Sequence, residues 1–383
     1  MLTSRGIVAP LLAVIGVFSS TAFGDDSAPN AAKPQYQAGG ITVPSASADE
    51  PLRKTFALAP ALDYAEQGAE AWSKTHRCVT CHTNGTYMLI RPALTAEAGK
   101  PSESMRSFFV RELKELRNPD RDPQEIRQDV QPTIAAYIAA GLAEWDAHIT
   151  KTLSPETVDA IELMFDVQSE DGSWGNQDCW PPFESDVFHG ATIAGIAIGT
   201  APGWLEHLSQ DAPQQAKVAR LKQYLQTTTP PHDYGRVMLL WANSRLPGLL
   251  DDVRKQEIIA MIGKHQREDG GWSLRAFSQP EAWGSGNRAE KLKSEPEYRD
   301  PPSDGHQTGL AVIVLREAGV PADDPRIQRA VRWLLTHQQE SGRWWTRSLN
   351  NDNHHFITYS GTLYPLLALS KCNSLAPSTG ETP

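Results

Sequence analysis

The sequence has few cysteines and no run of basic residues. Only 4 of its 383 residues are Cys, and 36 Lys and Arg face 46 Asp and Glu, which gives a formal net charge of -10. Nucleic acids and anionic membranes attract proteins through clustered Lys and Arg, so we expect no nucleic-acid partner. The composition favours instead a small apolar or aromatic ligand.

Long apolar runs are also missing after the first residues. Residues 7–19 are apolar, follow Arg5 and precede Ala22-Phe23-Gly24, which is typical of a secretory signal peptide cleaved near Gly24. This run is shorter than the roughly 20 residues that a membrane-spanning helix needs. We therefore expect a signal peptide at residues 1–24, no membrane span, and a mature protein that is periplasmic or secreted.

Residues 25–60 are rich in Ala, Pro, Ser and Gly and show no periodicity. Such a composition cannot bury enough apolar surface to order itself, so we interpret this segment as a flexible leader. The folded part is expected to be residues 61–372, followed by a disordered tail at residues 373–383.

Three segments share the pattern Q-x3-G-x-W: Gln168–Trp174, Gln266–Trp272 and Gln338–Trp344. Each follows a segment with helical periodicity, so the Gly is predicted to end a helix and the Trp to fold back beneath it. A second helical segment that is apolar on nearly all sides follows each stop, at residues 190–200, 308–318 and 360–369.

Three looser helical pairs complete the pattern. They are residues 61–80 with 88–98, 104–117 with 133–145, and 214–227 with 234–244. A single hairpin cannot bury its own apolar face, and repeated hairpins therefore stack on one another. The sequence predicts an all-α fold, an α6/α6 toroid in which six outer helices surround six inner ones.

The Q-x3-G-x-W pattern resembles the QW motif of squalene-hopene cyclases and oxidosqualene cyclases. The hairpin pattern is similar to that of the β-subunits of protein prenyltransferases, and the resemblance covers residues 61–372. It implies a closed ring around a ligand cavity. It does not extend to cyclase chemistry, because the D-x-D-D acid of the squalene-hopene cyclases is missing; Asp323 and Asp324 directly precede a helix and are interpreted as N-cap residues.

Carboxylates and imidazoles gather where the inner helices are expected to begin. They are Asp186, His189, His232, Asp233, Asp304, His306, His354 and His355, with Arg236 and Tyr359 nearby. Such groups from four hairpins are able to bind a metal or act as acid and base. Asp and His are also common helix caps, and we favour that interpretation. The polar insert at residues 273–303, which carries Trp283, is either a lid or a passive surface loop.

Cys78-Val79-Thr80-Cys81-His82 has the spacing of a c-type haem attachment motif. In that motif two thiols bond the haem vinyl groups and the His ligates iron. We predict Cys78 and Cys81 as the residues that bind haem c, and His82 as the iron ligand. A Cys78–Cys81 disulfide and a thiolate–imidazole metal clamp remain as alternatives.

The surroundings of this motif lead to further expectations. Met88, Met105 and His76 are weak candidates for a sixth iron ligand, and Cys179 and Cys372 form a disulfide if the ring brings them together. Aligning Trp72-x3-His76 with residues 333–337 places the motif where other hairpins carry their Q-x3-G-x-W stop. The motif is thus predicted to be built into the ring.

We expect a haem-bearing redox protein whose ring cavity binds an apolar or aromatic molecule, with a redox partner protein. One alternative is a terpene-cyclase-like or prenyltransferase-like enzyme that uses the Asp and His groups at the cavity mouth. The other is a binding scaffold without chemistry. The sequence leaves open whether the protein is an enzyme.

Overall fold

The computed structural model describes residues 33–375 except residues 123, 176–179, 184–185 and 209–211. The expected signal peptide, the start of the leader, Cys179 with its expected disulfide, and most of the expected tail lie outside the described residues. Residues from Pro34 onward belong to one compact unit. No helix among the described residues is long and apolar enough to cross a membrane.

Six helical hairpins follow one another along the described chain. In the order outer helix, inner helix, they are α1 (Leu58–His76) and α2 (Thr86–Ile90), α4 (Glu103–Leu116) and α5 (Gln131–Trp145), α6 (Pro155–Asp166) and α7 (Val187–Thr200), α9 (Ala212–Thr227) and α10 (Asp233–Arg245), α11 (Asp252–Lys264) and α13 (Gly305–Glu317), and α14 (Pro325–Thr336) and α15 (Ser360–Lys371). Short helices α3 (Thr95–Ala98), α8 (Trp204–His207) and α12 (Ala289–Ser294) lie in the connections. Each helical pair expected from the sequence is present.

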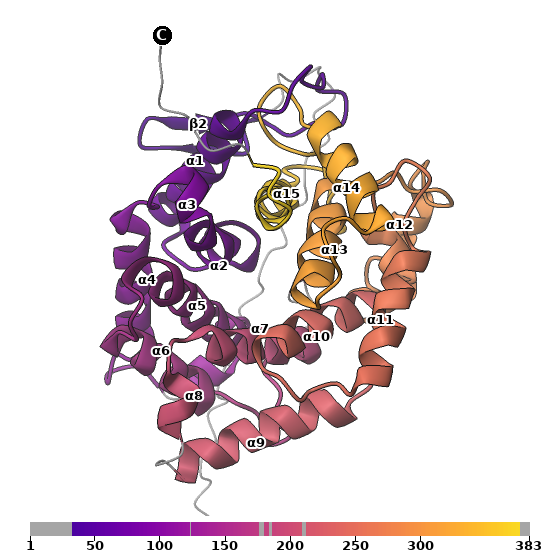
Figure 1. Ribbon diagram of the computed structural model, residues 1–383. Helices are drawn as coiled ribbons and strands as arrows, with labels where there is room; N and C mark the ends of the chain where they lie inside the picture. The colour runs from indigo at the N-terminus through magenta and orange to yellow at the C-terminus, as the bar shows by residue number, and fades with distance from the viewer. Residues whose placement is uncertain (1–32, 123, 176–179, 184–185, 209–211, 376–383) are drawn as a thin grey trace, which may run out of the picture. The chain divides into compact units, whose positions relative to one another are not determined.

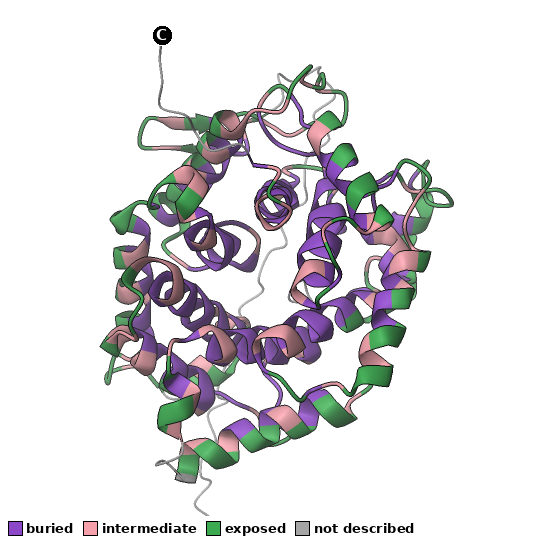
Figure 2. Cartoon of the chain, in the orientation of Figure 1, coloured by how far each residue is buried: buried purple, intermediate pink, exposed green. Residues whose placement is uncertain are grey.

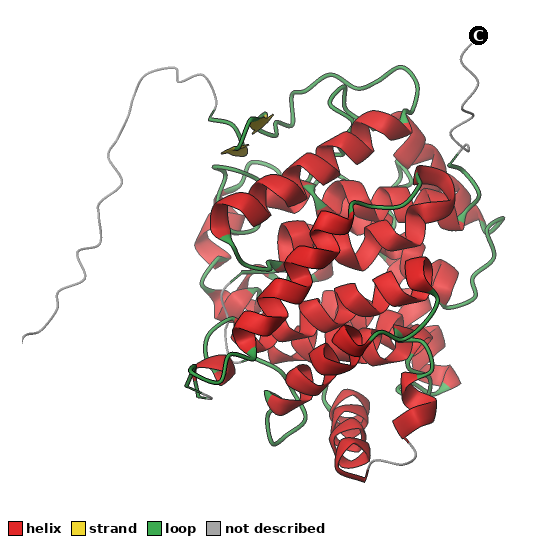
Figure 3. Ribbon diagram, turned by 90° about the vertical axis from the view of Figure 1, so that its left-hand side faces the viewer, coloured by secondary structure: helices red, strands yellow, loops and turns green. Residues whose placement is uncertain are grey.

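The inner helices close into a ring. They contact one another in the order α2, α5, α7, α10, α13 and α15, and α15 contacts α2 again. Inner helix α7 is buried from Phe188 to Ile198, whereas outer helix α14 buries one face only. Figure 2 shows the same division, with buried helices inside and exposed faces outside. The predicted all-α toroid is confirmed, and Figure 3 shows from the side that its regular structure is helical apart from one short pair of strands.

The three Trp residues of the Q-x3-G-x-W segments fold back as predicted. In each segment the indole Nε1–H donates to a carbonyl oxygen near the end of the preceding outer helix. The three bonds are Trp174 to Met164 (2.7 Å), Trp272 to Ile262 (2.8 Å) and Trp344 to Leu334 (2.8 Å). All three indoles are fully buried. Each of these hydrogen bonds therefore fixes the end of an outer helix from within the protein core.

The Gln residues of these segments tie each outer helix to the next one. Gln266 Nε2 donates to the carbonyl oxygen of Arg326 in α14, at 2.8 Å. Gln338 Nε2 donates to the carbonyl oxygen of Ala57, the N-cap residue of α1, also at 2.8 Å. This last bond joins the sixth hairpin to the first and closes the outer layer.

Residues 34–57 are part of the fold, which corrects the expectation of a flexible leader up to residue 60. Strand β1 (Tyr36–Ala38) pairs antiparallel with β2 (Ile41–Val43). The buried guanidinium of Arg343 binds the Glu50 carboxylate at 3.2 Å and the Pro44 carbonyl oxygen at 3.1 Å. The segment is ordered by contacts with residues some 300 positions away. The local sequence pattern of residues 34–57 does not predict such contacts.

The insert at residues 273–303 packs against the ring. It consists of short helical turns and α12, and its Trp283 is only 1% exposed. The Trp283 ring centroid lies 4.6 Å from that of His232 and 5.7 Å from that of Tyr234. Two hydrogen bonds join Arg275 to Glu295 within the insert. The insert therefore packs beside the start of α10 through Trp283, while much of its remaining length is exposed.

Candidate functional site

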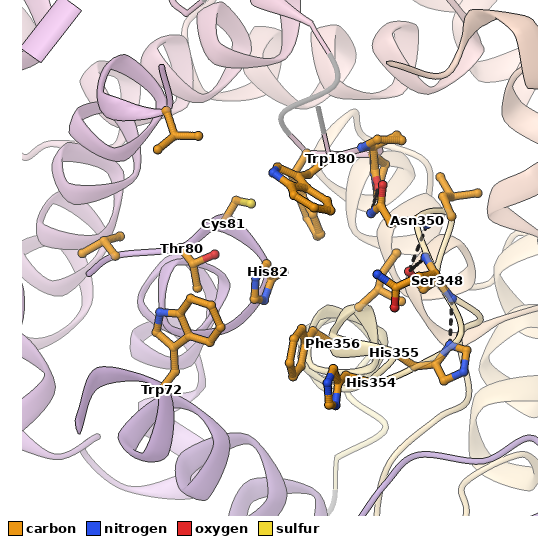
Figure 4. A pocket seen from close by; sticks show the side chains of 18 of the residues that line it. Trp72, Thr80, Cys81, His82, Trp180, Ser348, Asn350, His354, His355 and Phe356 are labelled. Atoms are coloured by element: carbon orange, nitrogen blue, oxygen red, sulfur yellow. Dashed lines mark hydrogen bonds between the residues drawn. The ribbon is translucent and has the colours of Figure 1, made fainter. Parts of the chain in front are cut away.

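A cavity of about 400 Å³ opens at the starts of the inner helices. Its lining comes from Trp72 and residues 78–82, from Val130 and Ile134, from residues 180–183, and from residues 348–351 and 354–357. Figure 4 shows Trp72, His82, Trp180 and Phe356 arranged around it. Small-molecule and cofactor sites commonly have volumes of about 300–1,000 Å³ and apolar walls. This cavity has both properties, and the CxxCH segment forms one of its walls.

Asn84 and Gly85, which lie shortly after the CxxCH segment, hold its backbone in place. The buried Asn84 side chain donates from Nδ2 to the Cys78 carbonyl oxygen at 3.0 Å and accepts the Thr80 N–H at 2.8 Å. The Gly85 N–H donates to the Thr80 carbonyl oxygen. A Cβ at position 85 would lie only 2.4 Å from that oxygen, so a side chain does not fit here. A short π-helical turn, Cys81–Gly85, then leads into α2.

The position of the motif in its hairpin agrees with the alignment made from the sequence. The rings of Trp72 and His76 stack at 3.8 Å between centroids, and those of Trp333 and His337 stack at 4.5 Å. Trp72 Nε1–H also donates to the Cys78 carbonyl oxygen at 3.0 Å. The CxxCH segment therefore follows its outer helix where the Q-x3-G-x-W stop follows α14.

His82 is oriented by a hydrogen bond to its neighbour. Its Nδ1 lies 2.7 Å from Thr83 Oγ1, which is also 2.9 Å from the hydroxyl of Tyr36. When Nδ1 donates its proton to Thr83, Nε2 keeps a free lone pair. Burial, with a smaller contribution from His76, lowers the pKa of His82 to about 3. The imidazole is thus held neutral, which is the form that binds metals.

Two further histidines line the opposite part of the cavity. His354 stacks on Phe356, with centroids 5.0 Å apart, and its Nδ1 is buried without a hydrogen-bond partner. His355 Nδ1 accepts the Ser348 N–H at 3.1 Å, and burial lowers the pKa of His355 to about 4. Sequence reasoning placed both residues at the cavity mouth, and the structure places both in the cavity wall.

The rim of the cavity is linked to the insert. Asn350 donates from Nδ2 to the Pro181 carbonyl oxygen at 3.1 Å and accepts a hydrogen bond from Arg288 Nε at 3.1 Å. The Arg288 guanidinium also lies 5.6 Å from the ring centroid of Trp180, whose side chain is 48% exposed. A cation and an exposed indole therefore stand together at the cavity mouth.

The candidates for a sixth iron ligand lie elsewhere. Met88 is fully buried against Gly141 of α5, and Met105 lies in a separate groove between α1 and α4. His76 stacks on Trp72. None of the three lines the cavity.

Most of the polar residues at the helix starts are caps, as we favoured. Asp186 accepts the N–H of His189 at 2.8 Å and begins α7. His232 caps α10, Asp304 caps α13 and Asp324 caps α14 in the same way. Burial raises the pKa of Asp304 to about 6.

The remaining members of this group do not converge on a metal. Asp233 pairs with His265 at 2.9 Å and with Arg236 at 3.1 Å, and the Tyr359 ring stacks on Tyr64 at 4.5 Å between centroids. Within the described ranges, no three His, Cys, Asp or Glu side chains are grouped closely enough to hold a metal ion.

Sequence reasoning missed two tyrosines that bind the inner histidines. The Tyr137 hydroxyl lies 3.0 Å from His189 Nε2, and the Tyr234 hydroxyl lies 3.2 Å from His306 Nε2. Tyr137 belongs to α5 and Tyr234 to α10, and each partner histidine belongs to a different inner helix. Only the order of the helices around the ring brings them together.

No protein-family model matches the chain, and no curated protein matches it. Among solved structures, a wild-type glycosidase is 14% identical with a TM-score of 0.44, over 83% of this chain and 86% of that chain. A glycosidase variant in complex with glucose gives the same values. At these scores the likeness carries no argument about activity.

Proposed function

We propose that the protein binds haem c covalently and serves a redox role; Cys78 and Cys81 would hold the haem and His82 would ligate its iron. The observation that carries this proposal is that all three residues line the same cavity of about 400 Å³. A chance CxxCH on a helical surface would have no such space in front of it.

The walls of the cavity suit a large apolar macrocycle. Trp72, Ile134, Phe183 and Phe356 supply aromatic and aliphatic surface. Burial of a flat apolar group against such side chains is favourable by about 25 cal/mol per Å². The buried Nδ1 of His354 has no protein partner and suits a polar substituent, such as a haem carboxylate.

The hydrogen bonds behind His82 also suit an iron ligand. A histidine that binds a metal usually donates its second ring N–H to a neighbour, which fixes the tautomer and the ring orientation. Thr83, supported by Tyr36, occupies that position. Bound haem would supply one-electron chemistry at the iron, while the side chains of the ring exclude water and hold the His82 imidazole in place.

The surroundings of the site extend the proposal. Export by a signal peptide would bring the chain to the compartment in which haem c is attached, and the exposed Trp180 at the cavity mouth would contact a small aromatic ligand or a partner protein. The repeats support descent of the ring from the squalene-cyclase and prenyltransferase repeat superfamily. A terpene-cyclase mechanism is disfavoured because Asp186 and Asp304 serve as helix caps.

The test is expression in a periplasm that contains haem-attachment machinery, followed by a pyridine haemochrome assay and intact mass. We expect one covalent haem in the wild type and none in the Cys78→Ala/Cys81→Ala variant. The Cys372→Ala variant is the matched control and should keep its haem, since Cys372 does not line the cavity. Wild-type protein without haem, from cells that load a control cytochrome, would contradict the proposal.

A further inference from the structure

The insert at residues 273–303 forms most of a second cavity, also of about 400 Å³, which we call the insert cavity. Its one lining residue outside the insert is Arg267, in the Q-x3-G-x-W stop that follows α11. Among the described residues, it shares no lining residue with the cavity at the starts of the inner helices. Its volume falls within the range of about 300–1,000 Å³ that is usual for small-molecule sites, so the insert has room for a ligand of its own.

Positive charge dominates the lining of the insert cavity. One lining residue, Asp300, carries a carboxylate, and three are arginines: Arg267, Arg275 and Arg299. The Arg275 guanidinium is already bound, because it donates to both carboxylate oxygens of Glu295, at 2.5 and 2.9 Å. This pair fixes one wall of the cavity, and the guanidinium groups that a ligand can use are those of Arg267 and Arg299.

Neither Arg267 nor Arg299 has a strong partner. Arg267 Nε is buried without a hydrogen-bond acceptor, and its ion partner among the described residues is Asp300, at 2.8 Å. The Asp300 side chain is 84% exposed, and ion pairs at such exposed positions contribute little to stability. The Arg299 side chain is exposed and makes no hydrogen bond or ion pair with the residues that the structure describes. Two cations at the cavity are thus left for an anionic ligand.

Aromatic and aliphatic side chains form another part of the lining. Trp283 and Leu292 are buried, and Tyr298 is 37% exposed, so apolar surface lies deep in the cavity and a phenol lies at its edge. The Trp283 ring is held in place by His232, on which it packs. A flat apolar body packs well against such rings, and the surface for it exists before a ligand arrives.

We propose that the insert cavity binds a small aromatic carboxylate. Arg267 and Arg299 bind the carboxylate, because a guanidinium offers parallel N–H donors that match the two oxygens of this planar group. Trp283 and Tyr298 contact the ring of the ligand. Asp300 competes with the ligand for Arg267 and is displaced on binding. The site does not involve the CxxCH segment, so this inference is independent of the proposed haem.

The test is isothermal titration calorimetry of the whole protein with benzoate. We expect one binding site in the wild type and a loss of affinity of about tenfold or more in Arg267→Gln and in Arg299→Gln, since each removes hydrogen bonds to a charged group. Arg332→Gln, at an exposed arginine of α14, is the matched control and should bind as the wild type does.

A further variant separates a ligand site from a structural role of Arg267. Asp300→Asn removes the competing carboxylate and should bind benzoate more tightly than the wild type, whereas a purely structural ion pair predicts no gain.

Acetate and inorganic phosphate test the chemical class of the ligand. Both should bind more weakly than benzoate, because neither has a ring to place against Trp283 and Tyr298. Equal affinity for phosphate and benzoate would overturn the assignment of an aromatic carboxylate. No heat with millimolar benzoate, or unchanged affinity in both cavity arginine variants, would overturn the site itself. Protein with and without haem serves equally, so these outcomes leave the proposed function untouched.

Discussion

The Asn84 side chain donates to the carbonyl oxygen of Cys78 at 3.0 Å, so a residue after the CxxCH segment holds the residue that begins it. The same amide donates to Ser73 in α1 at 3.1 Å. Asn84, in the turn that leads into α2, therefore links the backbone at Cys78 to the outer helix before it.

Replacing Asn84 by Ala leaves the Thr80 N–H without its acceptor in a buried position. An unsatisfied buried group costs about 1–3 kcal/mol, and we expect the free energy of unfolding to fall by that amount. Urea unfolding followed by circular dichroism measures it. Asn353→Ala, at an exposed position, should change stability by less than about 0.5 kcal/mol. Equal effects of the two substitutions would contradict this role of Asn84.

Gly342 and Gly319 form a matched pair for the ring closure. Their φ angles are +93° and +94°, but a Cβ at Gly342 would lie 2.3 Å from the backbone of Pro60, whereas a Cβ at Gly319 meets nothing within 4 Å. Ala at Gly319 should cost about 1–2 kcal/mol for the left-handed backbone alone. Ala at Gly342 should cost clearly more, since the last stop then no longer packs on α1. Equal losses in urea unfolding would show that the close approach is unimportant.

The buried histidines should make the protein less stable in acid. Burial lowers the pKa of His82 and His306 to about 3 and that of His189 to about 4, from an ordinary value of 6.5. Below pH 6.5 the unfolded chain binds protons that the folded chain does not, so stability is full above that pH and falls as the pH drops towards 3 or 4. Each histidine contributes a slope of about 1.4 kcal/mol per pH unit.

His306→Gln should reduce the change of unfolding free energy with pH by the contribution of one histidine. Measurements of unfolding between pH 4 and pH 7 would detect this reduction. Asp304 acts in the opposite direction, because its pKa is raised from 3.8 to about 6. It is protonated in both states below about pH 3.8, and its destabilising effect is complete above about pH 6. A stability that is independent of pH in this window would contradict burial of neutral histidines.

If haem is bound as proposed, His82→Ala should change the visible spectrum of the protein, because the iron would lose its imidazole ligand. The two thioether bonds would remain, so the haemochrome assay should still detect haem. Met88→Leu and Met105→Leu should leave the spectrum unchanged, since neither methionine lines the cavity. A spectral change in either methionine variant equal to that in His82→Ala would contradict this geometry.

The ring was predictable from the sequence because its determinants are local and repeated. Gly172, Gly270 and Gly342 each recur at the same offset from a Gln and a Trp, and each performs the same task at the end of a helix. The CxxCH segment stands out in the sequence by its spacing, and the structure places it in the cavity wall; its role as a haem attachment site stays a prediction. The cap role of Asp186 and Asp304 followed from their place before apolar helices.

Other parts of the site depend on contacts between distant segments. Tyr36 supports Thr83 behind His82, yet it belongs to a segment whose composition is typical of a disordered leader. Tyr137 and His189 meet only because α5 and α7 are neighbours in the ring. Phe356 stacks on His82 from the last hairpin, at 5.3 Å between centroids. No spacing in the sequence encodes these pairs.

The bond from Gln338 to Ala57 also has a consequence for the order of assembly. A chain made from its N-terminus presents residues 78–82 long before residues 348–357, which form the facing wall of the cavity, have been synthesised. Until the sixth hairpin docks on the first, the cysteine pair therefore faces an open gap. Gln338 both donates to the Ala57 carbonyl oxygen and accepts the Ala57 N–H, so the start of the first outer helix is completed only when the last hairpin has folded against it.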